Sequence, residues 1–293
     1  MTISYPFSGC ATALVTPFRD GIIDYVALAK LLEFQLDGGA DALVVCATTG
    51  EASTLSDEEK FSLIEFCRDY TSRAVPIIAG IGSNCTSHAV SLARDAQKAG
   101  ADALLAVNPY YIKANDEGLV SHYTAIEEAT DLPIILYNVP SRTGQNIPAS
   151  VVASLAHHER ICGIKDAGSD IVYTERILRE CGCDFAVYSG NDDRISPILS
   201  LGGVGAISVV ANIFPKKIHD MCVMALTGKD AACARSQLEM LPLVDAIFSE
   251  VNPIGIKWAL YKMGIISPEY RLPLCPPCDK TKEAIEKAMK ETR

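Results

Sequence analysis

Short runs of apolar residues recur along the chain at strand length, and stretches with helical periodicity separate them. Several runs are almost wholly apolar, which is typical of parallel strands covered by helices on one face and by a packed interior on the other. The predicted strands are Cys10–Val15, Ala42–Cys46, Val75–Ala79, Ala103–Val107, Pro133–Tyr137, Ile161–Lys165, Phe185–Tyr188 and Ala206–Val209. Eight alternating β and α units in a chain of 293 residues predict an α/β fold, the TIM (β/α)8 barrel.

Local signals in the gaps support the helices between these strands. Ser56 and Glu59 have the spacing of a capping box, and Gly100 follows a helical stretch that begins near Thr86. The segments that begin at Gly39 and at Gly100 share the sequence Gly-Ala-Asp-Ala-Leu and lie 61 residues apart, about two βα units. The repeat indicates that one type of helix-to-strand connection is used more than once.

The last part of the chain is helical in pattern and longer than one closing helix requires. No convincing strand follows Val209, and the helical patterns cover Lys216–Leu226, Ala231–Phe248, Ile254–Met263 and Lys280–Lys290. We therefore expect a barrel over residues 1–225 and a C-terminal helical region over residues 226–293 that packs on it. Whether this region takes part in chemistry stays open at this stage.

The charge of the chain limits its partners. A net charge of -10 and a pI near 5.0 argue against nucleic acid or an anionic membrane as a partner, because both would repel such a field. The N-terminal sequence has no basic segment before an apolar core, and nowhere do 18 apolar residues run together without charges. These patterns predict a cytoplasmic protein with no membrane segment.

The chain has 11 cysteines, an odd number, and most of them lie inside apolar runs. This pattern indicates buried free thiols in a reducing compartment. Cys275-Pro-Pro-Cys278 has the spacing of a zinc or redox pair, but no second pair of ligands lies nearby. We favour a turn fixed by the prolines, and we expect neither a metal nor an organic cofactor.

Lys165 ends the predicted strand Ile161–Lys165, where a charged side chain is unexpected. Strand alternation predicts that Ile161, Gly163 and Lys165 share one face and that Asp166 points to the other, with Gly163 leaving open volume beneath the amine. Lys165 is either a surface lysine at a strand end or a nucleophile that forms a Schiff base.

Polar residues follow several predicted strands at the end where TIM barrels place their active sites. The segments are Thr48–Glu51, Asn108–Tyr111, Tyr137–Gly144 and Ser189–Asp193, together with Lys165 itself. A single segment of this kind is a weak signal. Several of them at one end of a barrel, with Lys165 among them, predict an active site.

The residue types suit carbon–carbon bond chemistry. The phenol of Tyr137 and the hydroxyl of Thr48 can pass protons, and the amide groups around Thr49 suit a carboxylate. Arg142 offers a planar fork for a second carboxylate. These parts predict aldol-type condensation or cleavage between a 2-oxo acid and an acidic partner.

Taken together, the polar segments resemble the dihydrodipicolinate synthase family. The similarity rests on Thr48-Thr49-Gly50-Glu51, Pro109-Tyr110-Tyr111, Tyr137–Gly144, Gly163-Ile164-Lys165 and Ser189–Asp193, and it runs in order from about Gly9 to Leu274. The resemblance implies condensation of pyruvate with L-aspartate 4-semialdehyde in lysine biosynthesis, with no metal or cofactor, by a homo-oligomer that is a dimer of dimers.

The resemblance also implies roles for individual residues. Lys165 would form the Schiff base, and Tyr137, Thr48 and Tyr111 would form a proton relay, with Tyr111 entering the site of a neighbouring subunit. The residues implied for substrate binding are Thr49 for the carboxylate of pyruvate, Arg142 for that of the aldehyde, and the main chain of Gly190 and Ile207 for the pocket lining.

The chain departs from the family at the effector site of members inhibited by L-lysine. Lys60 stands where those members often have histidine, His88 where they have glutamate, and Ala52 where they have serine, whereas Asn84 and Tyr110 match. A cation and a lost carboxylate disfavour the ammonium groups of lysine. We therefore expect weak inhibition by L-lysine, or none.

Two alternative functions stay open at this stage. One is another pyruvate-dependent aldolase such as N-acetylneuraminate lyase, which resembles this family in fold, lysine and tyrosine but does not usually have an arginine at the position of Arg142. The other is a barrel without catalysis that binds or regulates, against which the set Lys165, Tyr137, Thr48 and Tyr111 argues.

Overall fold

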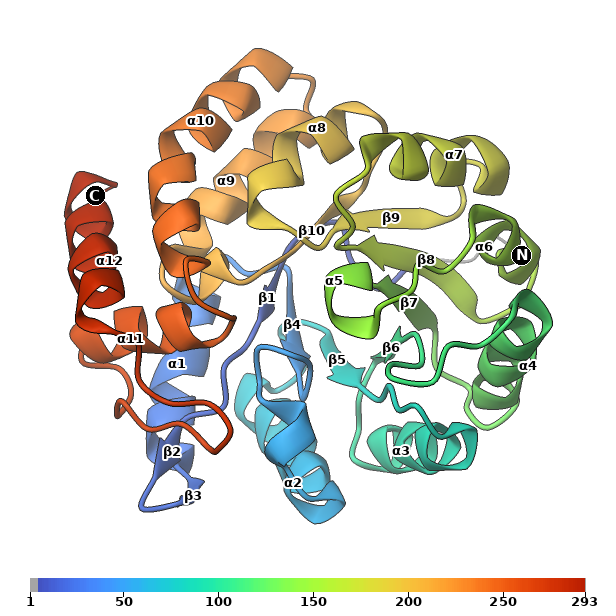
Figure 1. Ribbon diagram of the computed structural model, residues 1–293, viewed down its shortest axis with the longest axis horizontal. Helices are drawn as coiled ribbons and strands as arrows, with labels where there is room; N and C mark the ends of the chain where they lie inside the picture. The colour runs from blue at the N-terminus through green and yellow to red at the C-terminus, as the bar shows by residue number, and fades with distance from the viewer. Residues whose placement is uncertain (1–4, 293) are drawn as a thin grey trace.

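Eight parallel strands close into a barrel in the computed structural model, which describes residues 5–292 (Figure 1). The order around the barrel is β1-β10-β9-β8-β7-β6-β5-β4, which closes through the pairing of β1 with β4. The strands are β1 (Gly9–Ala13), β4 (Ala42–Val45), β5 (Ile77–Gly80), β6 (Ala103–Val107), β7 (Ile134–Asn138), β8 (Ile161–Asp166), β9 (Ala186–Ser189) and β10 (Gly205–Ser208). The predicted TIM barrel and its eight strands are confirmed, with bounds that differ by at most two residues.

Helices surround the barrel in the order expected for βα units. They are α1 (Tyr25–Asp37), α2 (Asp57–Thr71), α3 (Thr86–Lys98), α4 (Asp116–Glu127), α6 (Ala149–Leu155), α7 (Ile171–Cys181), α8 (Ile195–Ser200) and α9 (Pro215–Leu226). The predicted capping box is formed, because Ser56 and Glu59 exchange hydrogen bonds at the start of α2. Shorter elements lie between them: the hairpin β2 (Phe18–Arg19) and β3 (Ile22–Ile23), helix α5 (Pro140–Thr143), and the turns η1 (Ala52–Thr54), η2 (Asp192–Arg194) and η3 (Val210–Asn212).

The repeated Gly-Ala-Asp segments form the same connection twice. Gly39 and Gly100 have φ angles of 77° and 87°, a left-handed conformation that glycine adopts without strain. The aspartate two residues later then pairs with a residue of the neighbouring strand. Asp41 bonds to both backbone groups of Cys10, at 2.7 and 2.8 Å, and Asp102 bonds to both backbone groups of Ile77, at 2.8 Å each.

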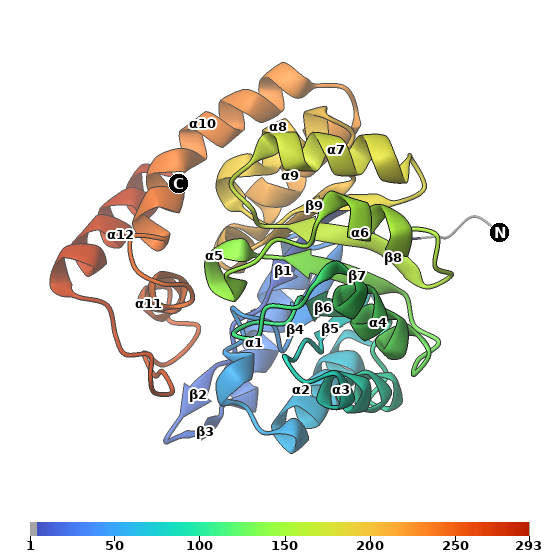
Figure 2. The same cartoon turned by 45° about the vertical axis from the view of Figure 1, so that its right-hand side comes forward.

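The chain after α9 forms three helices that lie together on one side of the barrel in both views (Figures 1 and 2). They are α10 (Asp230–Ile247), α11 (Ile254–Lys262) and α12 (Asp279–Glu291). Helix α10 packs on α9 and α8, and α12 packs on α10 and α11. The predicted helical appendage is therefore present. That residues 226–293 form a unit separate from the barrel stays a prediction. Within residues 5–292, none of the helices has both the length and the apolar character to cross a membrane.

Strand β8 does not follow the simple alternation that we predicted. The register with β7 shifts between Ile134 and Ile135, so Cys162 packs in the barrel interior and Ile161 packs outside against the helices. Gly163 also does not leave open volume, because a Cβ atom there would lie 2.5 Å from the carbonyl oxygen of Ala186. Gly163 is instead needed for the close approach of β9.

The predicted turn at Cys275-Pro-Pro-Cys278 is also wrong. The four residues have no turn, and Cys278 is the residue that precedes helix α12. Both thiols are free and exposed. The neighbouring turn falls at Leu272–Pro273 instead.

Candidate active site

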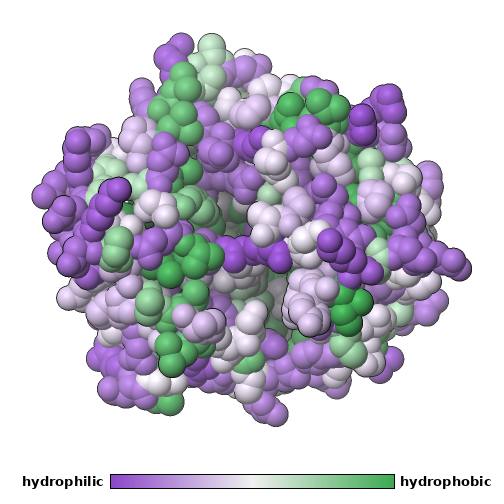
Figure 3. Space-filling model, viewed as in Figure 1, coloured by the Kyte–Doolittle hydropathy of each residue, from purple (hydrophilic) through white to green (hydrophobic). Residues whose placement is uncertain are grey.

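A cavity of about 620 Å³ opens at the carboxyl ends of β4 to β7. The face of the molecule that it opens on is hollowed near its centre (Figure 3). The residues that line it come from the ends of the strands, from α5 and from the C-terminal region; they include Ala47, Thr48, Tyr137, Val139, Arg142, Val251, Asn252, Pro253, Pro273 and Leu274. The cavity is therefore at the barrel end where we predicted the site.

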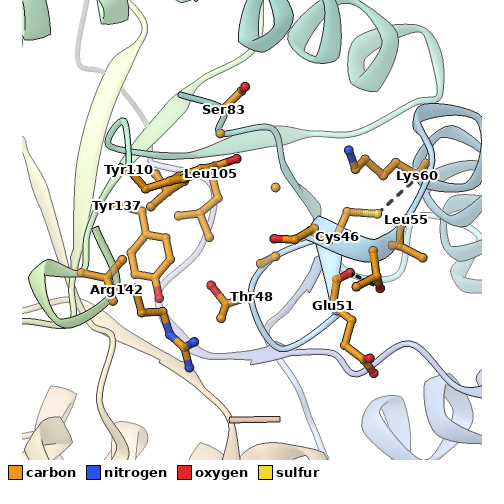
Figure 4. Close-up of a pocket in the computed structure, with 18 of the residues that line it drawn as sticks. Cys46, Thr48, Glu51, Leu55, Lys60, Ser83, Leu105, Tyr110, Tyr137 and Arg142 are labelled. Carbon is orange, nitrogen blue, oxygen red and sulfur yellow. Dashed lines mark hydrogen bonds between the residues drawn. The ribbon is translucent and has the colours of Figure 1, made fainter. Parts of the chain in front are cut away.

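Lys165 and Tyr137 lie side by side on β8 and β7, where the register pairs them directly. Lys165 is 4% exposed, and its Nζ atom lies 4.3 Å from the centroid of the Tyr137 ring. The ring of Tyr137 reaches the cavity (Figure 4). The amine is thus buried beside the ring of a residue that lines the cavity, although Lys165 itself is not among the lining residues. This burial excludes the surface lysine considered above.

The carboxylate that follows Lys165 is engaged elsewhere, as strand alternation predicts. Asp166 accepts hydrogen bonds from Asn138 Nδ2 at 3.1 Å, from the Gly168 amide at 2.9 Å and from Thr174 Oγ1 at 2.7 Å. These three donors hold the carboxylate outside the barrel wall. No described salt bridge involves Lys165 among residues 5–292.

A second carboxylate, Asp192, lies buried at the start of η2 and was not singled out from the sequence. Its oxygens accept hydrogen bonds from Ser208 Oγ and from the amides of Val209 and Val210. Burial raises the pKa of Asp192, and these hydrogen bonds together with the positive charge of Lys165 oppose that rise. The motif Ser189–Asp193 contained this residue, but its pattern did not show that Asp192 connects the loops after β9 and β10.

The turn after β4 carries the two threonines. Thr48 faces the cavity beside Tyr137 (Figure 4), whereas Thr49 is 2% exposed and its Oγ1 accepts a hydrogen bond from Asn252 Nδ2 at 3.0 Å. The amide of Gly50 donates to the Ala47 carbonyl at 3.1 Å, so it is not free for a carboxylate as we had expected. Within residues 5–292, the amides of Thr48 and Thr49 have no backbone or side-chain acceptor.

Of the remaining predicted residues, Arg142 lines the cavity, whereas Gly190, Ile207 and Tyr111 are not among its lining residues. Arg142 is exposed at the rim, and its Nη2 donates to the Asn252 carbonyl at 3.1 Å. Ile207 is fully buried in the barrel interior, and the amide of Gly190 donates to the Asp166 carbonyl at 2.7 Å. Tyr111 does not join this group: it is 92% exposed, with a φ angle of 70°.

The cavity extends to the residues of the predicted effector site. Asp57 accepts from Lys60 Nζ at 3.0 Å and contacts His88 Nε2 at 2.9 Å. Burial alone would raise the pKa of Asp57, but the hydrogen bonds from Lys60 and His88 outweigh it and lower the pKa. The cation of Lys60 is therefore paired, a contact that the sequence did not reveal.

Cys46 lines the cavity and has a left-handed φ angle of 55°. Its Sγ contacts the Lys60 carbonyl at 3.7 Å (Figure 4). Burial raises the pKa of this thiol to about 12, so the group stays protonated and is a poor nucleophile near neutral pH.

The fold and the cavity define an enzyme of the (β/α)8 class, with its site at the carboxyl ends of the strands. The chain belongs to the dihydrodipicolinate synthetase family, whose model matches residues 6–292. A 4-hydroxy-tetrahydrodipicolinate synthase of Lachnoclostridium phytofermentans is 46% identical over 270 residues, which is 92% of each chain.

Solved structures of dihydrodipicolinate synthases are also similar to this chain. A dihydrodipicolinate synthase of Thermotoga maritima superposes with a TM-score of 0.97 at 40% identity, over 98% of this chain and 99% of the other. The dihydrodipicolinate synthase of Acinetobacter baumannii in complex with pyruvate gives a TM-score of 0.95 at 40% identity, over 97% and 98% of the two chains.

Proposed function

We propose that this enzyme condenses pyruvate with L-aspartate 4-semialdehyde to give 4-hydroxy-tetrahydrodipicolinate, a step of lysine biosynthesis. The observation that carries the proposal is the buried amine of Lys165, which lies 4.3 Å from the ring of Tyr137, a residue that lines a cavity together with Thr48 and Arg142. Relatives that cover nearly the whole chain carry the name of this synthase, which favours it over an N-acetylneuraminate lyase.

Lys165 is the nucleophile in the proposed mechanism. Its neutral amine attacks the keto carbon of pyruvate, the carbinolamine loses water, and the imine loses a proton from the methyl group to give an enamine. The enamine carbon then attacks the aldehyde carbon of the second substrate, and the aldehyde oxygen takes up a proton. The amino group of that substrate finally displaces Lys165 and closes the ring, so the enzyme amine is regenerated.

Tyr137 and Thr48 move protons in these steps, because their side chains reach the same cavity. The unpaired amides of Thr48 and Thr49 suit the carboxylate of pyruvate. Arg142 at the rim suits the carboxylate of the second substrate, which arrives after pyruvate is bound. Gly190 and Ile207 contribute main-chain groups to the wall. The mechanism uses no metal or organic cofactor.

Tyr111 completes the relay from a second subunit. Tyr111 is 92% exposed in the single chain and does not line the cavity of that chain. This position suits a side chain that enters the site of a neighbouring subunit. The proposed assembly is a homo-oligomer, a dimer of dimers, and its proposed compartment is the cytoplasm.

Reductive trapping tests the assignment of the nucleophile. Borohydride added in the presence of pyruvate should attach one three-carbon acid to the peptide that contains Lys165. The variant Lys165→Ala should lose the adduct, whereas Lys60→Ala, which removes a lysine that lines the cavity, should keep it. An adduct on a different lysine, or none with the unmodified enzyme, would contradict the mechanism.

A coupled assay tests the substrate pair. Turnover with pyruvate and aspartate semialdehyde should far exceed turnover with pyruvate and N-acetylmannosamine. The reverse ranking would assign the chain to the lyase instead.

A further inference from the structure

A fully buried ion pair joins the C-terminal region to the turn that carries the two threonines. Lys257 of α11 contacts Glu51 through Nζ and Oε1, and both side chains are 0% exposed. The rings of Phe18 and Tyr270 lie 4.5 and 5.1 Å from the same Nζ atom. Removing two charges from water is unfavourable, and apolar residues of the same size would often stabilise a fold as well. Stability alone therefore does not explain the pair.

The conformation of Glu51 shows what the pair holds in place. Glu51 has φ and ψ angles of 55° and 36°, a left-handed conformation that side chains other than glycine rarely adopt. Its amide donates to the Thr48 carbonyl at 3.1 Å, which closes the turn. Its second carboxylate oxygen accepts from the Arg271 amide at 3.2 Å. Both oxygens of Glu51 are thus held by the C-terminal region.

The rest of the turn has further anchors. Thr49 Oγ1 is held by Asn252, and Thr16 Oγ1 donates to the Gly50 carbonyl at 2.7 Å. None of these contacts involves the side chain of Thr48, which faces the cavity. The position of the Thr48 side chain therefore depends on the backbone of the turn. The ion pair holds the end of this turn that follows Thr48, at Glu51.

We propose that Lys257 is a positioning residue for the condensation, which acts through Glu51 to keep the Thr48–Glu51 turn in its reactive geometry. The proposal rests on the proposed function. Without the ammonium of Lys257, the Glu51 carboxylate is buried without a charge partner and turns toward water. The left-handed backbone then relaxes, and Thr48 and the amides for the carboxylate of pyruvate move away from Tyr137.

The variant Lys257→Met tests this role, because methionine fills a similar volume without the charge. A misplacement of about 1 Å costs roughly 100-fold in rate, so kcat/KM for pyruvate should fall by about that factor. Lys165 stands on β8, outside the turn, so borohydride should still trap pyruvate at saturating concentration. The matched control is Lys262→Met on the same helix, which breaks the half-exposed pair with Glu286 at 3.2 Å and should leave kcat/KM within about twofold.

A double variant separates positioning from stability. Lys257→Met combined with Glu51→Gln leaves no unpaired buried charge, so its melting temperature should recover toward that of the unmodified protein. Its kcat/KM should remain about 100-fold low, because glutamine has no partner on α11 to hold the turn. Recovery of activity together with the melting temperature would overturn the proposal, as would normal kcat/KM in Lys257→Met.

The outcome also separates this proposal from the proposed function. If the unmodified enzyme fails to trap pyruvate, the proposed function is wrong whatever the variants do. If it traps pyruvate and condenses it, but the Lys257 variants are as active as the Lys262 control, only the positioning role is wrong.

Discussion

Gly163 lies in the barrel wall where a side chain has no room, and replacing it by alanine should lower the stability of the fold and disturb the site. A Cβ atom at Gly163 would lie 2.5 Å from the Ala186 carbonyl oxygen and 2.9 Å from the Ala186 Cβ. Cβ atoms essentially never approach other atoms closer than 3.0 Å, so β8 and β9 must separate by at least about 0.5 Å. Overpacking of this kind costs about 1–3 kcal/mol.

In a chain of this length, each kcal/mol lost from the free energy of unfolding lowers the melting temperature by about 2–4 °C. Lys165 is two residues further along β8, so the shift also moves its amine against Tyr137, and borohydride trapping at subsaturating pyruvate should slow by about tenfold or more. Calorimetry and a trapping time course measure the two effects.

The control for this variant is Gly228→Ala, which is far from the site in sequence and meets no atom within 4 Å. It has a positive φ of 75°, so it should cost backbone strain alone. Adding Ala186→Gly to Gly163→Ala should rescue only part of the loss, because the nearest atom belongs to the backbone. Full stability and normal trapping in Gly163→Ala would refute the reasoning about close approach.

Three further outcomes test the site. Arg142→Ala should raise KM for aspartate semialdehyde by tenfold or more while imine formation with pyruvate changes little, and equal loss of both would indicate a structural role. Mixed subunits of Tyr111→Phe and Lys165→Ala should regain activity in hybrid oligomers, and failure after verified exchange of subunits would count against a shared site. L-lysine at millimolar concentration should inhibit weakly or not at all, because the Asp57 carboxylate is already bonded to Lys60 and His88. Half-inhibition below a millimolar concentration of L-lysine would contradict this prediction.

The barrel could be predicted from the sequence because each strand is a short apolar run between helical patterns. The register of β8 could not, since Ile161, Cys162 and Ile164 are all apolar and give no alternation from which to read which side faces inward. The close approach at Gly163 depends on the neighbouring strand, and no local pattern contains that information.

The position of the cavity could be predicted because Thr48 and Tyr137, which line it, lie after or at the end of a strand. The catalytic roles of these residues and of Lys165 stay predictions. Contacts from the C-terminal region were not predictable. Asn252 and Lys257 lie more than 200 residues from the turn that they hold, and a lysine in a helical pattern usually indicates a solvated face. Only the packing of α11 on the barrel shows that Lys257 is buried.

The connections at Asp41 and Asp102 bear on how such a chain can change during evolution. In each connection, one aspartate satisfies both backbone groups of a residue in the adjacent strand, so an inserted or deleted residue between the glycine and the aspartate would leave those groups unpaired. Asp41 and Asp102 immediately precede β4 and β6, at the end of the barrel opposite the cavity. Insertions should therefore accumulate at the end that holds the cavity, where new loops can alter which substrates enter while the barrel stays closed.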